Sequence, residues 1–139
     1  MQQISMQALL LGSVIVAALL IYVPFLVVAY GRVQIGMEAI AQPRAVLDKL
    51  PSFAKRATWA HQNSFEAFVL FAAAALMAYV TEVDSPWAAR AAIAHVIARL
   101  LYSVFYILNI PIGRSLMFGV GSLSTATLMA LSFMATLRN

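Results

Sequence analysis

The sequence contains no cysteine among its 139 residues. That absence excludes disulfide bonds, cysteine-ligated metal sites and any chemistry that needs a thiolate of the protein itself. The first seven residues, MQQISMQ, contain neither lysine nor arginine, whereas the n-region of a signal peptide is positively charged. We therefore expect the apolar run that follows them to be retained as a membrane span.

Charge is also scarce in this chain. Only 10% of the residues are charged and 63% are hydrophobic, with a mean hydropathy of +0.89. Soluble domains contain about a quarter charged residues and about half apolar ones. The nine lysines and arginines are scattered between apolar runs, so the net charge of +4 does not indicate nucleic-acid binding, which uses a clustered basic surface. Composition and length predict one integral membrane domain over residues 1–139.

Four apolar segments are long enough to cross a bilayer, which takes about 20 residues of helix. They cover about residues 6–30, 63–81, 87–108 and 115–137. The fold class we predict is all-α, an integral membrane four-helix bundle. Pro24 lies inside the first segment, and we expect a kink there because proline has no N–H to donate.

The connections between these segments differ in charge. The first, residues 31–62, contains five cations against Glu38 and Asp48, whereas the second, TEVDSP, contains only acidic charges. The five cations are Arg32, Arg44, Lys49, Lys55 and Arg56. Because lysine and arginine accumulate in cytoplasmic loops, we predict a cytoplasmic first connection and both termini on the opposite side.

The second segment has polar residues near its start. Trp59, Asn63, Glu66 and Leu70 follow i, i+4, i+7, i+11 spacing and therefore share one helix face. A polar group inside a membrane is costly and is by default a functional candidate. The alternative is that Asn63 caps the helix and Glu66 complements its N-terminal dipole.

The third segment contains a polar stripe on an apolar helix. His95, Arg99, Tyr102 and Tyr106 have the same i, i+4, i+7, i+11 spacing. An arginine at membrane depth costs about 2.5–3.5 kcal/mol on insertion scales, so Arg99 needs a partner. The helical rise places Arg99 about 13 Å and Glu66 about 6–8 Å inside the predicted cytoplasmic boundary, and a long arginine side chain can reach toward that boundary. They either share a cavity or form an ion pair that only locks the two helices together.

Two further arginines lie near the same predicted boundary, Arg32 after the first segment and Arg114 before the fourth. Each is either a boundary anchor or part of the polar site. Guanidinium groups bind carboxylates in a forked geometry, so such a site fits a small anion with several charges. The pattern contains no metal triad, no nucleotide-binding loop and no nucleophile–base pair, and any nucleophile would arrive with a cosubstrate.

Two stretches resemble the MAPEG family, the membrane-associated proteins of eicosanoid and glutathione metabolism. RATWAHQNSFEAF is similar to the family's A-x-x-N-x-x-E signature. ARLLYSVFYILNIPIGRS resembles its R-x-x-Y-x-x-x-Y stripe, which is followed by a short turn and an R-S pair. The resemblance extends over the whole chain, because the four segments and the long basic connection also agree.

The resemblance implies a homotrimer with glutathione as cosubstrate, bound between neighbouring subunits near the cytoplasmic side. Its second substrate would be a hydrophobic electrophile or a lipid hydroperoxide from the bilayer. Arg114 would stabilise the glutathione thiolate. The residues implied to bind glutathione are Arg32, Asn63, Glu66, Arg99, Tyr102 and Tyr106. The alternative function is a non-catalytic membrane module, a small carrier or assembly subunit whose Glu/Arg stripe only holds helices together.

Overall fold

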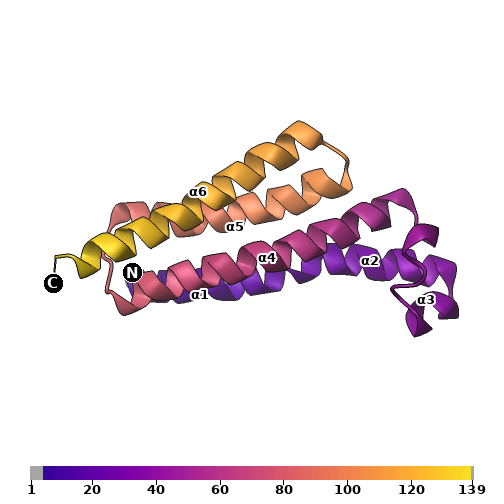
Figure 1. Ribbon diagram of the computed structural model, residues 1–139, viewed down its shortest axis with the longest axis horizontal. Coiled ribbons are helices and arrows are strands. Elements are labelled where there is room, and N and C mark those ends of the chain that lie inside the picture. Colours follow the sequence, from indigo (N-terminus) through magenta and orange to yellow (C-terminus); the bar gives the residue numbers. More distant parts are fainter. Residues whose placement is uncertain (1–4, 139) are drawn as a thin grey trace.

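The computed structural model describes residues 5–138, and within that range every regular element is helical. Figure 1 shows long helices packed side by side, with a small helical region at one end. The elements are α1 (Met6–Leu20), α2 (Tyr22–Ile35), α3 (Met37–Ala41), the short 3-10 turn η1 (Leu47–Lys49), α4 (Ser52–Val80), α5 (Pro86–Ile107) and α6 (Pro111–Thr136).

The long helices form four rods. The first rod consists of α1 and α2, which are separated by an interruption at Ile21. Pro24 cannot donate to the carbonyl of Leu20, four residues earlier, and the interruption lies one turn before the proline. Ile21 keeps helical backbone angles (φ −57°, ψ −36°), and a kink at Pro24 stays a prediction. The Ile21 carbonyl oxygen lies 2.8 Å from Nδ1 of His61 on α4. This contact joins α4 to the point where the first helix is interrupted.

Four rods are long and apolar enough to cross a membrane: 6–35, 52–80, 86–107 and 111–136. The prediction of four span-length helices is therefore confirmed. The second rod begins at Ser52, well before residue 63, because no helix-breaking residue separates Pro51 from Thr81. Asn63 thus lies inside a helix, and the alternative of a helix-capping role for it was wrong.

Alanines fill much of the space between the helices. Small residues let membrane helices approach closely. Gly31 on α2 likewise permits a close approach to α4, since a Cβ there would lie 2.4 Å from Cβ of Ala54. The fully buried alanines include Ala54, Ala57, Ala60, Ala74, Ala78, Ala88 and Ala92.

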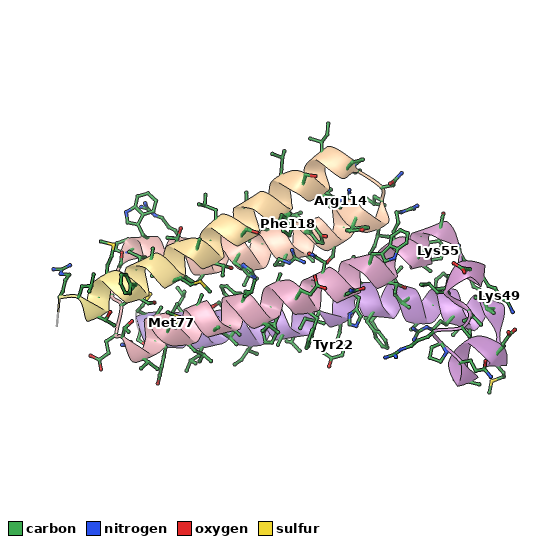
Figure 2. The ribbon with its side chains drawn as sticks, viewed as in Figure 1. Tyr22, Lys49, Lys55, Met77, Arg114 and Phe118 are labelled. Carbon is green, nitrogen blue, oxygen red and sulfur yellow. The ribbon has the colours of Figure 1, made fainter. Side chains whose placement is uncertain are left out.

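The two ends of the molecule differ. The described ends of the chain and the α4–α5 turn lie at one end, and α3 and the α5–α6 turn lie at the other (Figure 1). Figure 2 places Lys49, Lys55 and Arg114 toward the α3 end. The charges are thus distributed as the sequence predicts, and which end faces the cytoplasm stays a prediction.

Candidate functional site

A cavity of about 410 Å³ lies between α4, α5 and α6. This volume is within the range of small-molecule sites in proteins, about 300–1,000 Å³. Asn63, Glu66 and Arg99, all predicted site residues, line it together. The other lining residues are Ala67, Leu70, Phe118, Gly121, Ser122, Thr125, Ala126 and Met129.

The cavity is amphipathic along its length. Its amide, carboxylate and guanidinium groups come from Asn63, Glu66 and Arg99. Further toward the end where the chain termini lie, Leu70 and Met129 make the wall apolar. The cavity can therefore hold a molecule with a polar, charged part beside an apolar one.

Arg99 is 5% exposed, and its partners are neutral. Its Nη2 donates to Oδ1 of Asn63 at 3.0 Å and to Oγ of Ser64 at 3.3 Å. Glu66 is exposed instead and accepts a 3.3 Å hydrogen bond from Nε2 of Gln62. In the described part of the chain, Glu66 and Arg99 share the cavity without forming an ion pair. The alternative of a purely structural Glu66–Arg99 ion pair was therefore wrong, because Asn63 and Ser64 of α4 accept hydrogen bonds from the guanidinium instead.

Arginine and tyrosine side chains continue from the cavity to the start of α6. The guanidinium of Arg99 lies 4.1 Å from the ring centre of Tyr102, and that of Arg114 lies 4.5 Å from the ring centre of Tyr106. The two tyrosine rings meet edge to face at 5.6 Å. We call these four residues the Arg/Tyr ladder. Each cation–π contact contributes about 0.5–2 kcal/mol, and the higher values apply where water is excluded.

The α5–α6 turn brings Arg114 to Tyr106. Asn109 adopts a left-handed backbone conformation (φ 60°), and Pro111 is well suited to open a helix because its missing N–H is not needed there. A Cβ at Gly113 would lie 2.8 Å from the Phe105 ring, so this glycine permits the close turn. Nε of Arg56 donates to the Ile107 carbonyl at 2.8 Å and ties α4 to the end of α5.

Arg32 is the one predicted binding residue that lies apart from this site. It is on α2, half-buried, and it neither lines the cavity nor joins the ladder. A contact between Arg32 and glutathione stays a prediction.

The sequence analysis did not identify the residues of α6 that line this cavity. Arg114, Phe118, Gly121 and Thr125 have i, i+4, i+7, i+11 spacing, which places them on one helix face. That spacing was the available signal. Figure 2 shows Phe118 one turn along α6 from Arg114.

Comparison with known proteins agrees with the resemblance seen in the sequence. The model of the MAPEG family matches residues 9–134. No curated protein and no solved structure matches the chain. The family contains glutathione transferases and peroxidases as well as non-enzymatic members. Together with the four apolar rods, the match makes this a multi-pass membrane protein, and the chain belongs to the MAPEG family.

Proposed function

We propose that this protein is a glutathione-dependent membrane transferase or peroxidase that works as a homotrimer of single-domain subunits. Its second substrate is a hydrophobic electrophile or a lipid hydroperoxide that enters from the bilayer. The observation that carries the proposal is the amphipathic cavity beside the Arg/Tyr ladder. Family membership supports glutathione as the cosubstrate.

In this proposal the polar part of glutathione binds to Asn63, Glu66 and Arg99. The carboxylate of Glu66 is exposed and has no cationic partner in the described chain, so it is free to bind the ammonium group of the tripeptide. Arg99 provides a guanidinium whose orientation is already fixed by Asn63. Tyr102 and Tyr106 line the path toward Arg114, and Arg32 of a neighbouring subunit supplies a further carboxylate contact.

Arg114 acts on the sulfur. A free thiol has a pKa of about 8.5, and a fixed cation nearby lowers it. Arg114 thus increases the fraction of thiolate at neutral pH. In the transferase reaction the thiolate forms an S–C bond with the electrophile, and the leaving atom takes the electron pair. In the peroxidase reaction the thiolate attacks the terminal peroxide oxygen, the O–O bond breaks, and the alkoxide leaves and takes a proton to become the alcohol. A second glutathione then attacks the resulting sulfenic acid, which gives the disulfide and water.

The first test is thermal stability of the purified protein in detergent, with millimolar glutathione or an S-alkyl glutathione. A ligand that binds only the folded state raises stability by mass action. We expect a rise in the apparent Tm with both ligands, and particles with the mass of three 15.1-kDa chains. If neither ligand raises the Tm, the proposed cosubstrate is wrong.

The alternative is a non-catalytic membrane module, and one observation favours it. The Arg99–Asn63 and Arg99–Ser64 hydrogen bonds join α5 to α4, as a helix-locking role requires. This alternative predicts that Arg99→Ala abolishes assembly and that glutathione has no effect on stability. The enzyme predicts that Glu66→Gln still assembles but binds glutathione weakly.

A further inference from the structure

A second, smaller polar centre lies beside the candidate site, inside the bundle. His95 on α5 is 1% exposed and stacks on Phe71 of α4, with ring centres 3.8 Å apart. Its Nδ1 lies 3.1 Å from the Gly121 carbonyl oxygen and 3.2 Å from Oγ1 of Thr125. Oγ1 of Thr125 donates to the same Gly121 carbonyl at 3.1 Å. Since a carbonyl oxygen can only accept, we assign the ring proton to Nδ1.

The proton on Nδ1 determines the hydrogen-bonding role of the other ring nitrogen, Nε2. In a neutral histidine with a proton on Nδ1, Nε2 is an acceptor. Nε2 of His95 is buried and has no hydrogen-bond partner among residues 5–138. Nε of Arg99, one helical turn away and always a donor, is likewise buried without a partner in that range. Each buried polar group without a partner costs about 1–3 kcal/mol.

The two nitrogens belong to residues that line the same small cavity. The volume available there to the centre of a water molecule is about 10 Å³, and one water needs about 10–15 Å³ by that measure. Ser64 and Leu20 also line it. Because Pro24 has no N–H, the Leu20 carbonyl does not receive the hydrogen bond that an uninterrupted helix would give it.

We propose that this cavity is a binding site for one structural water, which accepts from Nε–H of Arg99 and donates to Nε2 of His95 and to the Leu20 carbonyl. A buried water typically makes about three hydrogen bonds to otherwise unsatisfied groups, and this site offers one donor and two acceptors. The water joins the break in the first helix to α5.

The consequence for the site is that His95 is a positioning residue for Arg99. Nη2 of Arg99 is held by Asn63 and Ser64, and the water holds the Nε side. The guanidinium is thereby fixed from both sides. This consequence rests on the proposed function, whereas the water site itself does not.

The direct test is magnetic resonance of ¹⁵N-arginine-labelled protein in deuterated detergent. We expect a cross-peak between the assigned Nε–H of Arg99 and a long-lived water. His95→Asn keeps an amide near the Nδ1 position but has nothing at Nε2, and it removes the cross-peak. His95→Gln places an amide oxygen near the Nε2 position and retains it. Absence of the cross-peak in the wild type, or its persistence in His95→Asn, overturns the proposal.

Affinity for an S-alkyl glutathione tests the positioning role. We expect the Kd to rise about fivefold or more in His95→Asn, as for the loss of one hydrogen bond, and to recover in His95→Gln. Ser132→Ala is the control, because it also removes a deeply buried polar group of the bundle, and it leaves the Kd unchanged. An unchanged Kd in His95→Asn overturns the positioning role. A wild type that shows the cross-peak but binds no glutathione contradicts the proposed function alone.

Discussion

At the scale of single residues, the site depends on arginines whose partners are aromatic rings and neutral groups. The guanidinium groups of Arg99 and Arg114 lie over tyrosine rings, and Arg99 also donates to an amide and a hydroxyl. No carboxylate neutralises either of them within the described residues. Both therefore keep their full charge for an anionic ligand.

Arg114→Ala tests the chemistry at this scale. A cation near a thiol lowers its pKa by about 1–3 units, so the substitution reduces the thiolate fraction. We expect turnover at pH 7 to fall roughly tenfold or more, and the loss to shrink as the pH approaches 9, because there the thiol ionises without help. The measurement is the pH profile of kcat/KM with trimer mass as a check on assembly.

Arg44→Ala is the matched control for that profile. Arg44 is an exposed cation in the connection at the same end of the molecule, and its removal changes the net charge equally. We expect it to leave the profile unchanged. Equal turnover in the wild type and Arg114→Ala at all pH values would remove Arg114 from the chemistry.

The sequence was informative about single residues where helical spacing applied. Arg99, Tyr102 and Tyr106 fell on one stripe because periodicity alone determines a helix face. The partner of Arg99 was not predictable, since Asn63, Ser64 and Glu66 were all near the expected depth. Only the packing of α4 against α5 determines which of them reaches the guanidinium.

At the scale of helices, small residues set how closely the rods approach. The sequence located four long helices from hydropathy but could not place their ends in the first connection, where Pro51 is the true start signal for α4. It also could not show which glycines lie in contacts. Gly31 and Gly119 look alike in sequence, but only Gly31 has a neighbour within contact distance.

Gly31→Ala tests this contact. The added Cβ would lie 2.4 Å from Cβ of Ala54, which cannot rotate away. Overpacking costs about 1–3 kcal/mol, so we expect the apparent Tm to fall by roughly 3–10 °C. Gly119→Ala, with no neighbouring atom within 4 Å, should be neutral or slightly stabilising, because alanine favours helix. Equal Tm values for the two variants would refute the close α2–α4 contact.

Gly121 tests the contribution of α6 to the large cavity. A Cβ there would meet Cδ of Arg99 at 3.5 Å, an ordinary contact, so Gly121→Ala should fold and bind. Gly121→Leu directs a larger side chain at Arg99, His95 and Ala98 of α5, which a Cβ there would already contact, and it displaces Arg99 from the cavity wall. We expect its Kd for an S-alkyl glutathione to rise about tenfold or more. Gly119→Leu, on an exposed position of the same helix, is the control, and comparable Kd values for both leucine variants would place the ligand elsewhere.

At the scale of the whole molecule, the two ends carry different charges. The α3 end contains Arg44, Lys49 and Lys55, and its one described ion pair joins Lys49 to Glu38 at 2.7 Å. The α4–α5 turn at the other end contains Glu82 and Asp84. An even number of rods places both described ends of the chain on the side of that turn, as Figure 1 shows.

The absence of cysteine allows a test of which side that is. Gln42→Cys places an exposed thiol in the first connection, and Asp84→Cys places one in the exposed α4–α5 turn. Because cations accumulate on the cytoplasmic side, a membrane-impermeant maleimide applied to intact cells should label Asp84→Cys and spare Gln42→Cys. Inverted vesicles should give the opposite pattern, and detergent should expose both. Labelling of Gln42→Cys in intact cells would reverse the orientation and place the Arg/Tyr ladder near the outer face, away from cytosolic glutathione.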